Sequence, residues 1–187
     1  MEKKDNYNRL EGLITPFLIG EEQQISDIVY SCIDNSPISK NYSPETVKSL
    51  KKLYTPERIL GRILRDKKQG YEIWSARHEE RLRWVMGLGK NQKEKELEIE
   101  MFYGLNSIEG AKGARQLLLK AKQELIRTQY KYLVGKVLKP AQRFIKKMGN
   151  LNGNVHISKL ETVKEIDPDT NAEFTFQIVR YRYTLSN

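Results

Sequence analysis

Side chains that commonly carry catalysis are scarce in this sequence of 187 residues. The histidines are His78 and His156, and Cys32 is the single cysteine. His78 lies in the charged stretch ARHEER, where an exposed or ion-paired histidine is the simplest interpretation. The sequence has no His-x-x-x-His pair, and one cysteine can form neither an intrachain disulfide nor a Cys-based zinc cluster. We therefore expect no catalytic residue, no metal site and no cofactor.

Glutamates form the main concentration of acids, with Glu94, Glu96, Glu98 and Glu100 at every second position. Such carboxylates could bind a divalent metal for nuclease chemistry, although charged faces supply similar glutamates routinely. Residues two apart share one side of a strand but not of a helix, so the stretch ELEIEMFY can also be interpreted as β. A metal-dependent nuclease is the least favoured of three functional hypotheses.

A glycine-containing segment, GLNSIEGAKGARQ, precedes a predicted helix and could hold a phosphate at the helix N-terminus. Its glycines are Gly104, Gly110 and Gly113. The segment lacks the Gly-Lys-Ser/Thr ending of a nucleotide-binding loop. We favour a flexible entry to the helix, and backbone contact to a nucleic-acid phosphate remains a second interpretation.

Positive charge is concentrated in one part of the chain. Residues 107–150 contain 11 Lys and Arg against 2 Asp and Glu, which equals the formal net charge of +9 of the whole protein. A second basic patch lies at 48–68, and the C-terminal stretch RYRY could stack bases on Tyr181 and Tyr183 while its arginines contact phosphate. Localised positive charge of this kind indicates an anionic partner.

The candidate nucleic-acid-binding residues come from these three regions. They are Arg115, Lys120, Arg127, Lys131, Lys139, Arg143, Lys146, Lys147, Arg58, Arg62, Arg65, Lys67, Lys68, Arg180 and Arg182.

The elements that would position these residues are mostly helical. Apolar residues recur with helical spacing from Ile126 to Met148, which predicts a long basic helix with a kink at Pro140. Ser43-Pro44 and Thr55-Pro56 are helix start signals, and we expect a further helix over YEIWSARHEERLRWVMGLG. The last segment is rich in β-branched and aromatic residues around the turn sequence DPDTNA, which predicts a hairpin with a bulge near Ile178.

These expectations combine into an α+β fold that is mainly α. A helical domain over 1–150 carries the long basic helix, and a C-terminal β-hairpin over 151–187 packs on the helical body or on a partner. An isolated hairpin is marginally stable in water, so this packing is required.

The leading functional hypothesis is a non-enzymatic nucleic-acid-binding protein that contacts the backbone of RNA or DNA, as a small basic subunit of a ribonucleoprotein or other nucleoprotein complex. By analogy of size and charge alone, a small subunit of a CRISPR effector complex is one example. The alternative is a protein-interaction or adaptor subunit with an acidic partner. We expect nucleic acid and other protein subunits as partners, no membrane insertion, and a cytoplasmic or other reducing location. The residues do not indicate RNA over DNA, a sequence preference, an oligomeric state or a process.

Overall fold

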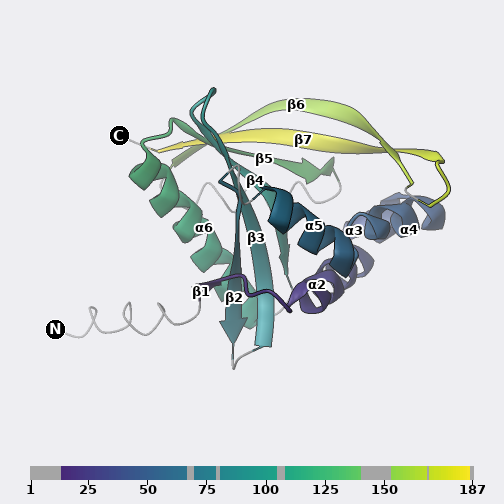
Figure 1. Ribbon diagram of the computed structural model, residues 1–187. Coiled ribbons are helices and arrows are strands. Elements are labelled where there is room, and N and C mark those ends of the chain that lie inside the picture. The colour runs from purple at the N-terminus through teal and green to yellow at the C-terminus, as the bar shows by residue number, and fades with distance from the viewer. Residues whose placement is uncertain are drawn as a thin grey trace.

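The computed structural model describes residues 14–66, 70–78, 81–104, 108–139, 153–167 and 169–185. Its centre is a seven-stranded sheet in the order β1-β2-β3-β4-β5-β7-β6 (Figure 1). The strands are β1 (Ile14–Pro16), β2 (Glu72–His78), β3 (Arg81–Asn91), β4 (Glu96–Gly104), β5 (Tyr132–Leu138), β6 (Gly153–Ile166) and β7 (Glu173–Leu185). Neighbours pair antiparallel except β4 and β5, which are parallel. The prediction of a mainly helical bundle is wrong, because the core is built on this sheet.

One face of the sheet is covered by α6 (Ile108–Thr128). Leu117, Leu118, Ala121 and Leu125 of this helix are buried against sheet residues such as Leu97. Leu117, Ala121 and Leu125 are four residues apart and Leu118 precedes Ala121 by three, which places all four on one side of the helix and explains how an otherwise charged helix packs.

The opposite face is covered by four helices near the N-terminal end of the chain (Figure 1). They are α2 (Glu22–Asp34), α3 (Pro37–Asn41), α4 (Pro44–Lys52) and α5 (Pro56–Asp66). The Ser43-Pro44 start signal is confirmed: the Ser43 side chain accepts a hydrogen bond from the Thr46 backbone N–H, and Pro44 occupies the first turn. The Thr55-Pro56 signal is confirmed by the start of α5.

The helix predicted over residues 71–89 is two strands, β2 and β3. The sequence misleads here because residues 85–89 of β3 are all buried, so the strand has no alternation of apolar and polar positions. Gly87 and Gly89 lie within β3. The alternative β interpretation of ELEIEMFY is correct, since this stretch is β4.

The long basic helix predicted to continue past residue 128 is also wrong. Helix α6 ends at Thr128, and Gln129 adopts a left-handed φ of 57° that turns the chain into β5. Leu133 and Val137, expected on the helix stripe, therefore belong to a strand paired with β7. Pairing with two neighbours outweighs the helical spacing of these residues. The expected kink at Pro140 lies outside the described residues.

The C-terminal hairpin is present as β6 and β7, but β7 also pairs with β5, so the hairpin belongs to the central sheet. The register irregularity lies between Ile157 and Lys159 of β6, not at Ile178 of β7 as predicted. Ile178 and Val179 are both buried, because β7 is covered on both sides at this point. The proposed domain boundary at residue 150 lies outside the described residues and stays a prediction. Of the helices that the structure describes, none has the length and apolarity of a membrane span.

Candidate active site

Strands β4 and β5 separate partway along their length. They pair in register only from Glu96 with Tyr132 to Ile99 with Gly135. Beyond that point β4 remains paired with β3, and β5 remains paired with β7. Among the described strands, none pairs with residues 100–104 on the side of β4 that faces this opening.

A bulge marks the point of separation. In the β3–β4 register Leu88 pairs with Ile99 and Gly87 with Met101, so Glu100 is the extra residue. Bulges bend a strand and change the direction of its side chains. Residues before and after Glu100 illustrate this change: Ile99 belongs to the core beneath α6, whereas Met101 belongs to the core beneath α2 and α5.

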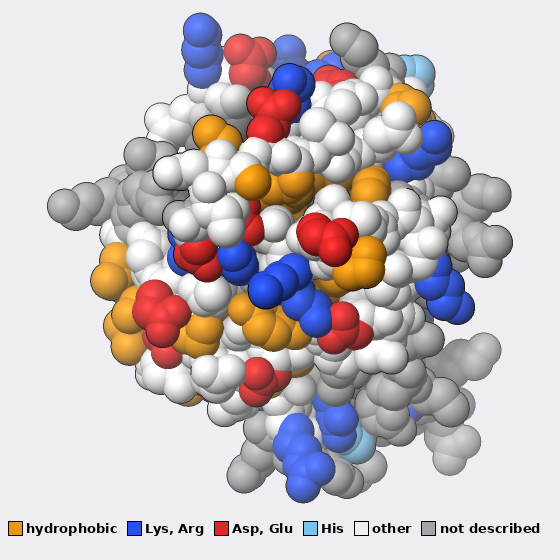
Figure 2. Space-filling view, turned by 90° about the vertical axis from the view of Figure 1, so that its right-hand side faces the viewer, with side chains coloured by type: hydrophobic (Ala, Val, Ile, Leu, Met, Phe, Trp, Pro, Cys, Tyr) orange, Lys and Arg blue, Asp and Glu red, His pale blue; other side chains and the backbone are white. Residues whose placement is uncertain are grey.

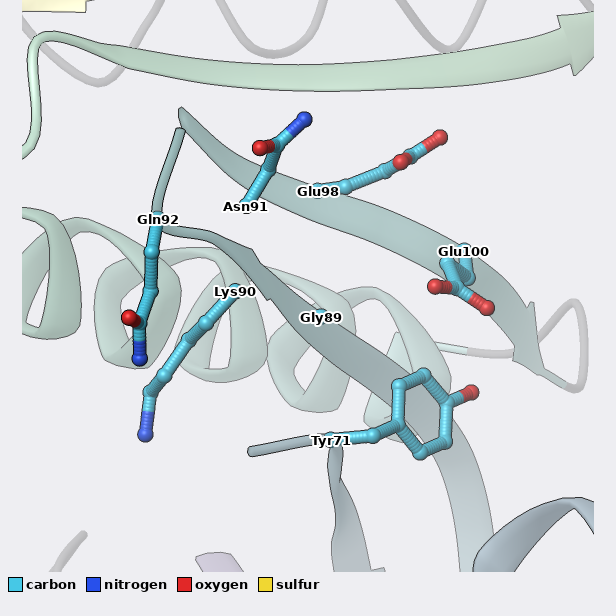
Figure 3. Close-up of a pocket in the computed structure, with 7 residues that line it drawn as sticks. All are labelled: Tyr71, Gly89, Lys90, Asn91, Gln92, Glu98 and Glu100. Atoms are coloured by element: carbon cyan, nitrogen blue, oxygen red, sulfur yellow. The ribbon is translucent and has the colours of Figure 1, made fainter. Parts of the chain in front are cut away.

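A hollow of about 480 Å³ lies beside this bulge, lined by Tyr71, Gly89, Lys90, Asn91, Gln92, Glu98 and Glu100. Figure 3 shows Glu98 and Glu100 projecting from β4 with the Tyr71 ring close to Glu100, while the Lys90 side chain turns away. Glycine forms the floor, since a Cβ at Gly89 would lie 2.8 Å from Glu100 Oε1. The hollow is therefore acidic and open, with an aromatic wall.

The surroundings of the two carboxylates differ. Glu98 forms an ion pair with Lys136 of β5 at 3.4 Å, and its side chain is 31% exposed. Glu100 is exposed and faces the hollow. Two carboxylates beside an aromatic ring can bind an ammonium group, and a carboxylate can accept a proton from a bound amine.

The N-terminus of α6 lies at the other end of β4. The indole ring of Trp84 packs between Gly104, the last residue of β4, and Gly113, near the start of α6; a Cβ at these glycines would lie 2.0 Å from Trp84 Cδ2 and 3.5 Å from Cδ1 respectively. The Trp84 indole N–H is buried and has no acceptor among the described residues. Lys112 and Arg115 are exposed on the early turns of the helix. Free backbone N–H groups and nearby cations suit an anion.

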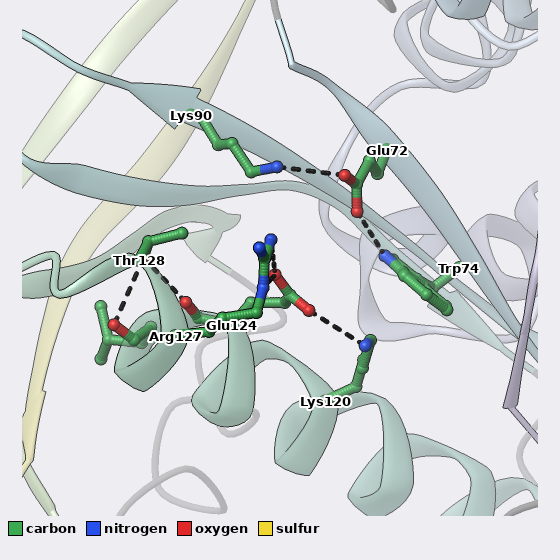
Figure 4. A network of polar contacts seen from close by, with 8 residues as sticks. Glu72, Trp74, Lys90, Lys120, Glu124, Arg127 and Thr128 are labelled. Carbon is green, nitrogen blue, oxygen red and sulfur yellow. Dashed lines mark hydrogen bonds and ion pairs between the residues drawn. The ribbon is translucent and has the colours of Figure 1, made fainter.

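Four of the predicted phosphate-contacting residues are engaged with local acids. Lys120 and Arg127 bind Glu124, Arg180 binds Glu161, and Arg182 binds Glu96. Figure 4 shows the Lys120–Glu124–Arg127 network together with the Lys90–Glu72 pair, both on the α6 side of the sheet. The charge excess in the sequence is therefore partly compensated in the folded protein.

The remaining candidates are dispersed. Lys131 is exposed just before β5, and Lys139 donates a hydrogen bond to Gln177. Arg58 and Arg62 lie on α5. The face viewed in Figure 2 interleaves basic and acidic side chains with apolar ones instead of presenting one basic surface. The side chains of Arg65, Lys67, Lys68, Arg143, Lys146 and Lys147 lie outside the described residues.

The glutamates of β4 do not form a metal centre in the part of the chain that the structure describes, where no group of three or more His, Cys, Asp or Glu side chains is close enough to hold an ion. Glu96 is bound to Arg182, and only Glu98 and Glu100 line the hollow. The metal-dependent nuclease hypothesis therefore lacks its site. The alternation of these glutamates is the sequence signal for a strand with one charged side. No sequence pattern marks Tyr71 or Gly89 as part of a site.

No family model matches the sequence, and no curated protein matches it. Solved structures do match the fold. A PaiA N-acetyltransferase from Thermoplasma acidophilum, in complex with coenzyme A, has a TM-score of 0.66 at 15% identity over 89% of this chain and 96% of its own. A GCN5-related N-acetyltransferase from Rhodopseudomonas palustris has a TM-score of 0.67 at 14% identity over 89% and 92%. A Bacillus subtilis acetyltransferase in complex with CoA has a TM-score of 0.55 at 13% identity over 93% and 99%.

These similarities overturn the hypothesis of a non-enzymatic nucleic-acid-binding subunit, since the similar structures are N-acetyltransferases. Three further expectations are wrong for the same reason. They are the nucleic-acid and protein-subunit partners, the membership of a ribonucleoprotein complex, and the alternative of an adaptor subunit. The sequence suggests that these basic side chains are free to bind phosphate, but in the folded protein several of them are bound to glutamates. This chain has the fold of the N-acetyltransferases.

Proposed function

We propose that this protein is an N-acetyltransferase that transfers an acetyl group from acetyl-coenzyme A to an amine. The observation that carries the proposal is the separation of β4 and β5 at the Glu100 bulge, directly beside the acidic hollow. An open strand edge and a carboxylate site for an amine therefore meet at one point of the sheet. Structures of the same fold with coenzyme A bound support the choice of acyl donor.

The residues present fit coenzyme A. The open edge of β4 over residues 100–104 offers backbone donors and acceptors to the amide groups of the pantetheine arm, as a strand edge does to an extended peptide. The N-terminus of α6, with Lys112 and Arg115 nearby, suits the phosphates. Acetyl-coenzyme A bound there would supply an acyl group activated as a thioester.

The chain's own residues have two tasks. Glu98 and Glu100 attract the ammonium form of the acceptor and orient it at the bulge, and Glu100 accepts the proton that the amine must lose. Backbone N–H groups of β4 on the open edge are donors for the oxygen on which negative charge develops during acyl transfer. Both groups are held by a paired strand, so little reorganisation is needed.

Coenzyme A binding is the first test, measured by isothermal titration calorimetry with the wild type, Lys112→Glu/Arg115→Glu, and Lys48→Glu. Lys48 is exposed on α4 and provides a control with the same type of charge change. We expect binding that weakens at least tenfold in the double variant and is unchanged in the control. Equal binding by all three proteins would contradict the placement of the phosphates.

Turnover is the second test. The protein is incubated with acetyl-coenzyme A and a panel of primary amines, and acetylated amine is detected by mass spectrometry. Mass detection avoids any background from Cys32, the single thiol of the chain, whose pKa is raised mainly by burial. Absence of both coenzyme A binding and acetylated product across the panel would refute the proposed function.

A further inference from the structure

Lys136 is the first residue of β5 beyond the point where β4 and β5 separate, because Gly135 is the last residue of β5 that pairs with β4. The Lys136 ammonium group lies 3.4 Å from the carboxylate of Glu98 on β4. Glu98 lines the acidic hollow, and Figure 3 shows its side chain projecting from β4. The protein therefore already places an alkylammonium group against one of the two carboxylates of the proposed amine site.

The Glu98–Lys136 ion pair is the loosest of three that cross this face of the sheet. The other two pairs are shorter, at 2.7 and 2.9 Å, and join Arg182 to Glu96 and Arg180 to Glu161. Arginine can form two parallel hydrogen bonds with a carboxylate, whereas the ammonium group of a lysine acts as a point charge. Of the three pairs, the one at Glu98 is therefore the easiest for a second cation to displace.

The neighbouring strand explains why Lys136 is directed toward Glu98. Lys136 and Arg180 are directly opposite one another in the β5–β7 register, and like charges in this position repel. Glu161 binds Arg180, and Lys136 forms an ion pair with no acid other than Glu98 among the residues that the structure describes. The Lys136 side chain is 45% exposed, so its release into solvent costs little, as for exposed ion pairs in general.

We infer that Lys136 competes with the acceptor amine for Glu98. In the free protein the Lys136 ammonium group occupies part of the amine site, and an acceptor binds there by displacing it. Because Lys136 is held on a strand beside the site, its effective concentration is high, and it lowers the affinity for every amine that uses Glu98 by the same factor. The inference rests on the proposed function for its description of the amine site, and it names the residue that sets the affinity of that site.

Removal of such a competitor has a defined kinetic signature. The amine binds more tightly, but the reaction that follows is unchanged. The KM for the amine should therefore fall, while kcat and the KM for acetyl-coenzyme A stay the same. Loss of a lysine that only stabilises the fold would not lower the KM for the amine.

The test is an NMR titration of the intact chain with butylamine, which requires neither coenzyme A nor turnover. Butanol, an uncharged molecule with the same carbon chain, is the control ligand. The first set of proteins comprises the wild type, Lys136→Met and Lys136→Arg. Lys164→Met is the matched control, because Lys164 forms an exposed ion pair with Glu173 at 2.8 Å and does not line the hollow.

A second set of proteins separates direct competition from a general effect of charge. Glu98→Gln and Glu98→Gln/Lys136→Met complete a double-mutant cycle with the wild type and Lys136→Met. Thermal unfolding curves confirm that each variant is folded at the temperature of the titration.

We expect Lys136→Met to bind butylamine roughly two- to fivefold more tightly than the wild type, which is the range expected for loss of an exposed ion pair. Lys136→Arg should bind no more tightly than the wild type, and Lys164→Met should bind as the wild type does. In the Glu98→Gln background, Lys136→Met should make no difference, because the carboxylate for which the two ammonium groups compete is absent. In the acetylation assay, the KM for the amine should fall by the same factor as the dissociation constant.

Three results would overturn the inference: an unchanged butylamine affinity in Lys136→Met, an equal gain in Lys164→Met, or a gain that persists in the Glu98→Gln background. A failure of the proposed function is seen separately, as absent coenzyme A binding and absent acetylation by a protein whose butylamine affinity still rises in Lys136→Met. A protein that acetylates amines but shows no such rise would retain the proposed function and lose only this inference.

Discussion

Glu124 and Glu100 are the same residue type on opposite sides of one sheet, and their surroundings differ completely. Glu124 lies on α6 and is 5% exposed. It forms ion pairs with Lys120 at 3.0 Å and with Arg127 at 2.6 Å (Figure 4). Glu100 sits on a bulge of β4 and faces an open hollow (Figure 3). Glu124 is covered and stabilises the fold, whereas Glu100 is exposed at the hollow, where an amine can reach it.

The largest expected effect tests the open carboxylate. Glu100→Gln removes the proton acceptor but keeps the shape of the side chain, so kcat for amine acetylation should fall by about 10²- to 10⁴-fold. Thermal unfolding should change little, because Glu100 is exposed. The measurement is mass-detected acetylation alongside an unfolding curve.

Glu94→Gln is the matched control for this change, since Glu94 is exposed in the β3–β4 turn and does not line the hollow. Full activity in both variants would show that Glu100 has no catalytic role, so Glu100 and Glu124 would no longer differ in function.

The next effect tests how closely the α6 side is packed. A Cβ at Gly104 would lie 2.0 Å from Trp84 Cδ2, so Gly104→Ala must displace the indole. We expect the free energy of unfolding to fall by roughly 1–3 kcal/mol, as in other overpacked cores. Urea denaturation measures it.

Gly61→Ala, in α5 on the other side of the sheet, is the counterpart. Its Cβ would meet nothing within 4 Å, and alanine favours a helix by up to about 1 kcal/mol. If Gly104→Ala left the free energy of unfolding unchanged and Gly61→Ala lowered it, the surroundings of Gly104 would be the looser of the two, contrary to the structure.

A smaller effect is expected at Glu124. Burial raises the pKa of Glu124, but hydrogen bonds from Arg127 and Lys120 outweigh it, and the net pKa lies below the ordinary value. Glu124→Gln should lower the free energy of unfolding by about 1–2 kcal/mol, at the modest end for a charged hydrogen bond because Arg127 reaches solvent. Acetylation by the folded variant should stay near the wild-type rate, and a large fall in kcat without a stability change would contradict the structural role.

The smallest effect concerns pH and a third carboxylate, Asp167 in the β6–β7 turn. The Ser49 hydroxyl donates to Asp167 at 2.5 Å, and Lys52 binds it at 3.0 Å, which together with backbone N–H groups lowers its pKa well below the ordinary 3.8. A carboxyl with a lowered folded-state pKa contributes stability above its unfolded pKa and loses it as the pH falls.

Wild-type stability should therefore decline as the pH drops from about 5 through the ordinary carboxyl range. Asp167→Asn should be less stable at neutral pH and should show a shallower decline in acid, as measured by urea midpoints across a pH series. Parallel declines in the two proteins would mean that Asp167 does not contribute to the pH dependence.

Local signals predicted some elements well. Ser43-Pro44 and Thr55-Pro56 start helices because a capping side chain and a proline at the first turn act within a few residues. Strand β3 could not be distinguished from a helix in the same way. Its residues 85–89 are buried from both sides, and that burial depends on helices located elsewhere in the chain.

The candidate site was harder to predict than the elements. In the sequence, the alternation of Glu98 and Glu100 suggests a metal centre and not an amine site. Tyr71, which directly precedes β2, and Gly89 of β3 reach the same hollow only through strand pairing. The bulge at Glu100 depends on the register of β3 against β4, and a register is a relation between two segments.

By itself the sequence determined the helix starts, the paired strands of the C-terminal hairpin and the excess of basic residues, because propensities, caps and composition are local properties. Only the tertiary structure decided that residues 132–138 are a strand, that β4 and β5 separate after Ile99, and that Arg180 and Arg182 face Glu161 and Glu96. Each of these features joins residues far apart in the chain, and the energies of pairing and burial that select them exist only once the sheet is assembled.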